Sequence, residues 1–98
     1  MPFHHVVLFR WKPDAPPAEV APVKPALDAL APTLTGVVSY QCGPGLGLSE
    51  TSYDFGVIGI FDSRTAWDAY MADPEHDRIR SDLILPIVVE RAGIQFEA

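Results

Sequence analysis

The stretch of sequence that decides the fold is residues 3–12, Phe-His-His-Val-Val-Leu-Phe-Arg-Trp-Lys. Successive side chains of a β-strand point to opposite faces, so this run divides into two rows. The row that contains His5 is the more aromatic one, with Phe3, Val7, Phe9 and Trp11. The opposite row holds His4, Val6, Leu8, Arg10 and Lys12. Because both rows carry apolar side chains, we expect a strand whose two faces are both partly covered.

Residues 18–34 carry the signal of a first helix. Apolar residues recur there at the spacing of a helix with one buried side: Val20, Val23, Leu27, Leu30 and Leu34. Pro22 and Pro25 interrupt the pattern, since proline lacks an N–H and clashes with the preceding turn. We therefore expect an irregular first turn and a regular helix from about Pro25, where proline is tolerated near a helix start.

The rest of the chain continues with strand and helix signals. Strands are expected at residues 37–42, 52–61 and 87–96. Before the last of these strands, residues 62–65 supply an N-cap and residues 66–71 continue as a helix. Its inward-facing side chains are expected to be Trp67, Tyr70 and Met71.

A further short helix follows, because Asp73 suits an N-cap and Pro74 suits the first helical position. The predicted order is then β-α-β-β-α-β in one domain spanning residues 1–98, which is the ferredoxin-like α+β arrangement. In this arrangement the helices pack on one face of an antiparallel sheet. Since the other face would still carry large apolar side chains, we expect a second copy of the chain to cover it. The expected assembly is a dimeric α/β barrel.

Composition and charge exclude several classes of partner. The chain has 98 residues, of which 48% are hydrophobic, and a formal net charge of −6. Residues 50–98 hold ten acidic and only four basic residues, whereas residues 1–49 are balanced. Without a cluster of Lys and Arg, we expect neither nucleic acid nor an anionic membrane as a partner. No secretion signal is recognisable and there is one cysteine, so a cytoplasmic location is expected.

Other chemical sites have little support in the sequence. Residues 43–50 are rich in glycine but lack a following Lys-Ser/Thr, so we interpret them as a mobile turn or rim. His4 and His5 point to opposite faces of one strand and cannot easily chelate one ion, and a single cysteine closes no zinc pattern. Cys42 has no histidine near it in the sequence and is interpreted as an inert thiol. We expect neither a metal nor a cofactor.

Three segments, taken in order, resemble the stress-responsive dimeric α/β-barrel (Dabb) family. They are His-Val-Val-Leu-Phe with Lys12 at residues 5–12, Tyr-Asp-Phe leading into Gly-Ile-Phe-Asp-Ser at residues 53–63, and Tyr-Met-Ala-Asp-Pro-Glu-His at residues 70–76. Two positions depart from the family pattern. Asp73 stands where a histidine is usual, and Gln95 stands near the end of the last strand, where an aspartate is common.

The resemblance implies a homodimer with a cavity between sheet and helices in each subunit. One characterised relative, the plant polyketide cyclase that makes olivetolic acid, performs an intramolecular aldol condensation with a tyrosine and a histidine, without metal or cofactor. By position, these catalytic residues correspond to Tyr70 and His76. His5 matches a further histidine of that cavity, and Phe55 replaces another. We expect His5, Phe55 and Trp67 to contact the substrate.

The chemistry of these residues fits such a reaction. His76 can act as the base, because imidazole titrates near neutrality and the start of a helix disfavours its charged form. Asp73 or Asp77 could instead hold the ring charged. Tyr70 can donate a hydrogen bond to an enolate oxygen. Each residue also has a purely structural interpretation: His76 at a helix start, Tyr70 as a core aromatic, and His5 as a hydrogen-bonded core histidine.

Three functional hypotheses follow from this pattern. The first is a cyclase-like or lyase-like enzyme that acts on an apolar or aromatic, polyketide-like compound. The second is a stress-associated protein that holds a hydrophobic ligand in the same cavity without turnover. The third is a cofactor-free monooxygenase, which rests on analogy with related dimeric barrels alone.

Overall fold

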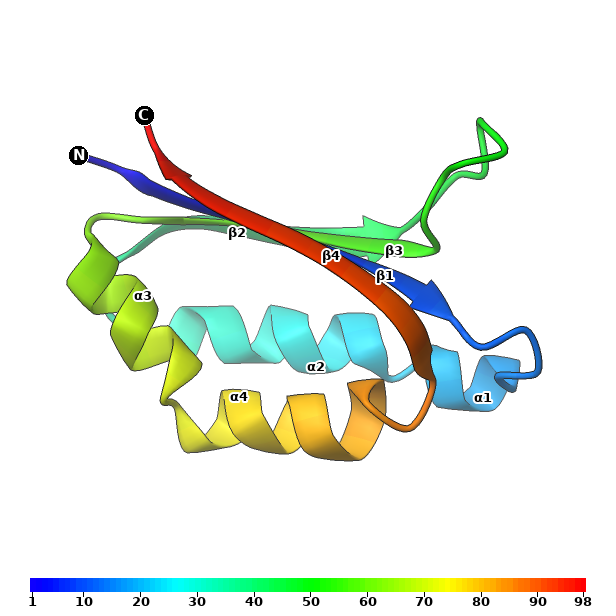
Figure 1. The fold of residues 1–98 in the computed structure, drawn as a ribbon. Coiled ribbons are helices and arrows are strands. Elements are labelled where there is room, and N and C mark those ends of the chain that lie inside the picture. The colour runs from blue at the N-terminus through cyan, green and yellow to red at the C-terminus, as the bar shows by residue number, and fades with distance from the viewer.

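The computed structural model describes all 98 residues and has two layers, a sheet and a layer of helices (Figure 1). The elements in chain order are β1 (Phe3–Trp11), α1 (Pro17–Val20), α2 (Val23–Leu30), β2 (Val37–Pro44), β3 (Phe55–Phe61), α3 (Arg64–Met71), α4 (Pro74–Ile79) and β4 (Val88–Glu97). A 3-10 turn, Ala31–Thr33, follows α2, and a π-helical turn, Arg80–Ile84, continues α4.

The four strands form one antiparallel sheet in the order β2-β3-β1-β4. The helices lie together on one face of this sheet and leave the other face uncovered (Figure 1). Because β1 and β3 occupy the centre of the sheet, β1 pairs with a strand on each side, β3 on one and β4 on the other. This architecture confirms the predicted ferredoxin-like α+β fold.

The aromatic row of β1 faces the helices and forms the core. Phe3, Val7 and Phe9 are buried, and each lies opposite another buried residue of β3 in the strand register. The largest fully buried side chains are Phe61, Ile79 and Val23. Burial of each large apolar side chain stabilises the fold by about 1.5–3 kcal/mol. The two-row pattern of residues 3–12 therefore sets which face of the sheet receives the helices.

The helical region before β2 is more broken than the sequence pattern predicts. It consists of the short α1, then α2 from Val23, then the 3-10 turn. Pro22 precedes α2 and Pro25 lies in its first turn, where the missing N–H has no intrahelical partner to lose. The expected irregular start is present, and the regular helix begins two residues before Pro25.

Two further expectations need correction. The third strand begins at Phe55 rather than at residue 52, because the chain bends at Asp54, whose carboxylate accepts a hydrogen bond from the backbone N–H of Trp11 at 2.8 Å. Met71, which was expected to face inward, lines the cavity between the sheet and the helices but is also 41% exposed. It lies in the last turn of α3, at the rim of the helix layer.

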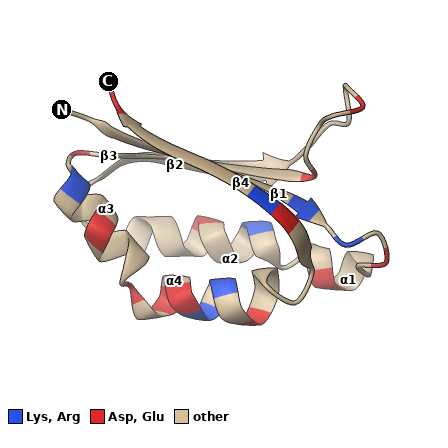
Figure 2. Cartoon of the chain, viewed as in Figure 1, with Lys and Arg blue, Asp and Glu red and all other residues tan.

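The uncovered face of the sheet is apolar. Large hydrophobic side chains exposed there include Ile58, Ile94 and Phe96. Figure 2 shows that most acidic residues lie on the helices and in the loops, whereas the middle of the sheet carries almost no charge. None of the helices has the length and apolar character needed to cross a membrane.

Candidate functional site

A cavity of about 210 Å³ lies between the sheet and the helices. Its apolar lining comes mainly from β1, β3, α2 and the π-helical turn, and its aromatic polar groups are His5, Tyr40, Tyr70 and His76. Typical ligand pockets measure roughly 300–1,000 Å³, so this cavity suits one small compound. It is the place where most of the predicted site residues meet.

Tyr70 lies at the centre of this group. The helix α3 is capped by the Ser63 side chain, which accepts a hydrogen bond from Ala66 N–H at 3.2 Å, and its one buried residue is Tyr70. The Tyr70 hydroxyl lies 3.0 Å from the hydroxyl of Tyr40 on β2, and either group can donate. Burial raises the pKa of both phenols, so both hydroxyls keep their protons at neutral pH.

His76 packs against Tyr70, with the two rings tilted relative to each other. The two ring centroids are 4.1 Å apart, although the residues belong to different helices. The Asp73 carboxylate caps α4 by accepting hydrogen bonds from the backbone N–H groups of Glu75 and His76 at 2.9 and 3.0 Å. This cap fixes the first turn of α4 and thereby the position of the His76 ring. The predicted N-cap at Asp73 is confirmed.

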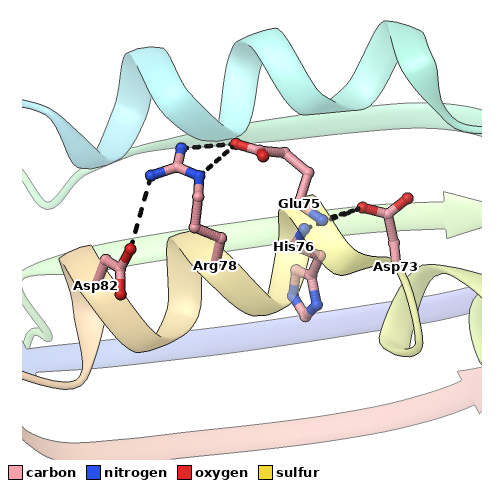
Figure 3. A network of polar contacts seen from close by, with 5 residues as sticks. All are labelled: Asp73, Glu75, His76, Arg78 and Asp82. Atoms are coloured by element: carbon pink, nitrogen blue, oxygen red, sulfur yellow. Dashed lines mark hydrogen bonds and ion pairs between the residues drawn. The ribbon is translucent and has the colours of Figure 1, made fainter.

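The His76 imidazole is turned toward the strands and away from the charged side of its own helix (Figure 3). Its Nδ1 atom is buried and has no hydrogen-bond partner in the chain. Burial lowers the pKa of His76, the neighbouring Arg80 lowers it further, and Asp73 and Asp77 offset this only in part. The ring is therefore neutral at pH 7 and can accept a proton.

His5 is the second imidazole of the cavity and is only 5% exposed. Its Nδ1 lies 2.9 Å from the amide nitrogen of Gln95 on the neighbouring strand β4. Burial, with smaller contributions from His76 and Arg91, lowers the pKa of His5 to about 4. With the Gln95 amide as donor, the proton of this neutral ring lies on Nε2.

Two of the residues expected to contact a substrate lie outside the cavity. Phe55 is 3% exposed and packs against Phe9 and Trp11, with ring centroids 6.5 and 5.8 Å away. Trp67 is half-buried and packs against the rings of Phe3 and His5. Neither side chain lines the cavity, whereas His5, Tyr70 and His76 do. Trp67 borders the site only through its contact with His5.

Cys42 lies away from the cavity on β2. Its thiol donates a hydrogen bond to Asp28 at 3.4 Å, and burial together with this carboxylate raises the pKa of Cys42 to about 11. A thiol with this pKa is a poor nucleophile at neutral pH. No group of three or more His, Cys, Asp or Glu side chains is arranged to hold a metal ion.

The structure adds three site residues that the sequence pattern did not identify. They are Tyr40, which completes the phenol pair, Arg91, which lines the cavity from β4, and Gln95, which orients His5. For Tyr40 a signal was available, because it shares the inward row of β2 with Cys42. Arg91 and Gln95 could be placed at the site only once the pairing of β4 with β1 was known.

The assembled groups are suited to proton transfer. Two neutral imidazoles and two protonated phenols border one apolar cavity. An imidazole can remove a proton, and a phenol can donate a hydrogen bond to an oxygen that becomes negative. No activated nucleophile lies among them.

Solved structures of other proteins share this fold over nearly their whole length. A dimeric ferredoxin-like protein of unknown function from Thermobifida fusca is 32% identical, with a TM-score of 0.91 over 100% of this chain and 92% of that chain. A Dabb family protein from Mesorhizobium loti is 20% identical, with a TM-score of 0.81 over 99% and 96%. A hydroxynitrile lyase from Passiflora edulis is 12% identical, with a TM-score of 0.82 over 97% and 91%.

A comparison with curated proteins finds no match. The family model described as the stress responsive A/B barrel domain (Dabb) matches residues 3–98. This match covers the whole sheet and all the helices, including the segment from Tyr70 to His76 that carries the family resemblance. The chain belongs to the Dabb family.

Proposed function

We propose that this protein is a cofactor-independent enzyme that makes or breaks a carbon–carbon bond next to a carbonyl group, by cyclase-like or lyase-like acid–base chemistry. Its substrate is a small apolar or aromatic compound that fits the cavity. His76 is the base and Tyr70 is the hydrogen-bond donor. His5 binds the substrate, and Gln95 orients the His5 ring. The observation that carries this proposal is the 4.1 Å contact between the Tyr70 and His76 rings at an open cavity.

In the condensing direction, neutral His76 removes a proton from the carbon next to a carbonyl. The electron pair moves onto that carbonyl oxygen, which receives a hydrogen bond from Tyr70. The enolate carbon then attacks a second carbonyl carbon, and the proton held by His76 passes to the oxygen of that carbonyl. Protons and electrons balance, so no oxidant or reductant is required.

The hydroxyl pair supports the role of Tyr70. With Tyr40 as the donor within the pair, the Tyr70 oxygen accepts one hydrogen bond and its own proton remains available for a substrate oxygen. A hydrogen bond received in this way also lowers the pKa of Tyr70 against the raising effect of burial. Tyr40 is therefore a positioning residue for the proposed donor.

The lyase from Passiflora edulis supports the same reaction class through its shared fold. Cleavage of a cyanohydrin starts when a base removes the hydroxyl proton. The oxygen then forms a carbonyl, the bond to the nitrile carbon breaks, and its electron pair leaves with cyanide, which takes the proton back from the base. His76 would have the same role in this cleavage as in the aldol reaction, because in both reactions a neutral imidazole accepts a proton next to apolar side chains of the cavity.

The test measures turnover of two substrate types, a linear poly-β-ketone and an aromatic cyanohydrin. We expect turnover of at least one of them by the purified protein. His76→Ala should lower the rate by about 10²-fold or more, and added imidazole should restore part of it. Tyr70→Phe should lower the rate by about tenfold or more, whereas Tyr53→Phe, a tyrosine outside the cavity, should not. Unchanged turnover in both cavity variants would refute the mechanism.

A second proposal concerns the assembly. The relative from Thermobifida fusca is described as dimeric, and the uncovered sheet face of this chain exposes Ile58, Ile94 and Phe96. A contiguous apolar patch of this kind marks an interaction surface. We propose that two copies pack through these faces, so that each cavity remains open on the helix side.

Ligand binding without turnover is the alternative function, and one observation favours it. Asp73 occupies a position where a histidine is usual in the family, and its carboxylate is engaged in capping α4. One candidate proton carrier is thus replaced by a structural group. The turnover assay separates the two functions, because a binding protein would bind the substrate but leave it unchanged.

A further inference from the structure

Arg91 is an unpaired positive charge at the cavity. Of the seven Lys and Arg side chains in this acidic protein, five form ion pairs: Arg10, Lys24, Arg64, Arg78 and Arg80. The two others are Arg91 and Lys12, an exposed residue that directly follows the first strand. Of these two residues, only Arg91 lines the cavity.

The placement of Arg91 follows from the sheet. It lies opposite Phe9 in the register of β4 with β1, and Phe9 belongs to the row that faces the helices. Its guanidinium group therefore extends on the helix side of the sheet rather than toward the apolar outer face. Arg91 also affects the chemistry within, because its charge helps to lower the pKa of both His5 and His76.

The charges around the cavity favour one negative charge on a ligand. The charged residues that line it are Arg80, Arg91 and Asp77, and Asp77 forms a 2.9 Å ion pair with Arg80. The guanidinium of Arg91 is therefore the one charged group of the lining without an ion-pair partner. Other acidic groups nearby are engaged elsewhere, since Glu75 of α4 and Asp82 of the π-helical turn pair with Arg78 on the far side of the helix (Figure 3).

We propose that the ligand of this cavity carries a single carboxylate, which Arg91 binds, at the end of an apolar body that reaches toward His5, Tyr70 and His76. This inference rests on the proposed function, which assigns the reacting end of the ligand to His5, Tyr70 and His76. It adds the chemical class of the substrate, a monocarboxylate. The planar guanidinium matches a carboxylate with two parallel hydrogen bonds. The net charge of −6 and the surplus of one local positive charge disfavour a dianionic ligand such as a phosphate ester.

The spacing along β4 sets the length of this ligand. Arg91 and Gln95 are four residues apart on one strand, so their Cα atoms are roughly 13 Å apart. Gln95 marks the position of His5, to which it is hydrogen-bonded, and an arginine side chain is long enough to span several ångströms of this interval. A ring with a side chain of a few carbons fits between the two ends. The matched probes are therefore 3-phenylpropanoate and its amide, 3-phenylpropanamide.

The test measures the dissociation constants of both probes by titration calorimetry at low salt. We expect the wild-type protein to bind the carboxylate about tenfold more tightly than the amide, and this preference to decrease as salt screens the exposed arginine. Arg91→Gln should remove the preference while leaving the affinity for the amide unchanged within about twofold. Lys12→Gln, which removes the other unpaired charge, should keep the preference.

Equal binding of the two probes by the wild-type protein, no binding of either probe, or an unchanged preference in Arg91→Gln would overturn the inference. His76→Ala separates it from the proposed function. A carboxylate preference that persists in this variant, together with lost turnover, supports both proposals. The same preference in a wild-type protein without turnover supports the role of Arg91 and refutes the proposed catalysis alone.

Discussion

The buried His5 makes the stability of the protein sensitive to acid. In the folded chain, burial holds the pKa of His5 at about 4, whereas an exposed imidazole of the unfolded chain titrates near 6.5. Between these values the unfolded state binds a proton that the folded state does not. The stabilisation of the neutral ring is thus fully present above pH 6.5, is lost as the pH falls, and changes no further below about 4.

The size of this loss follows from the shift. A difference of about 2.5 pKa units corresponds to roughly 3 kcal/mol when the transition is complete, and to roughly 2 kcal/mol by about pH 5. Against the 5–15 kcal/mol that holds a typical domain together, the effect is large enough to measure. It should appear as acid unfolding well above the pH at which exposed carboxylates are protonated.

The variant His5→Asn removes the titrating group and keeps an acceptor for the Gln95 amide. Urea unfolding, followed by tryptophan fluorescence at a fixed protein concentration, should be compared at about pH 7.5 and about pH 5. We expect the wild-type protein to lose roughly 2 kcal/mol more than the variant between these conditions. His4→Asn, on the opposite face of the same strand, should keep the loss due to His5.

The comparison between pH values cancels any constant cost of the substitution, and it also cancels the contribution of His76, which both proteins retain. An equal loss in the wild-type protein and in His5→Asn would refute the reasoning. It would mean that His5 is not held neutral by burial, and the proposed substrate contact at its Nε2 atom would lose its basis.

Three other outcomes follow from the structure. Because burial lowers the pKa of His76, the rate of the proposed reaction should hold at pH values below 6.5 and fall only as the ring becomes protonated, which a pH–rate profile measures. Asp73→Ala should cost about 1 kcal/mol of stability in urea unfolding and Asp73→Asn much less, since asparagine can still cap α4. Ile94→Lys should convert the proposed dimer into a monomer in sedimentation analysis, whereas Asp68→Lys on the helix layer should not.

The fold could be predicted because its signals are local. Alternation within residues 3–12 identifies a strand with two apolar faces, and spacing in residues 18–34 identifies a helix with one. Asp73 could be identified as an N-cap for the same reason, since capping depends only on the next few residues. The predicted start of the third strand was wrong because the chain bends at Asp54, next to contacts with residues far away in the sequence that no local pattern contains.

The cavity depends on contacts that no local pattern contains. Val88 and Arg91 both line it, although residues three positions apart in a regular strand point to opposite faces. The pairing of β4 with β1 shifts its register between Arg10 and Trp11, and this irregularity brings both side chains to the helix side. A period-two pattern therefore cannot place both Val88 and Arg91 on the helix side.

Two of the three buried polar atoms without a hydrogen-bond partner lie at the two proposed binding surfaces, whereas the third, Nε1 of Trp67, lies at neither. A buried polar atom without a hydrogen bond costs roughly 1–3 kcal/mol, so a fold selected for stability alone would avoid it. One such atom, His76 Nδ1, belongs to a ring that lines the cavity, and another, His4 Nδ1, belongs to a ring stacked on Phe96 at the uncovered face. The first cost is expected where a ligand binds, and the second where another copy packs. Both proposals thus predict the same feature, that binding supplies what these imidazoles lack.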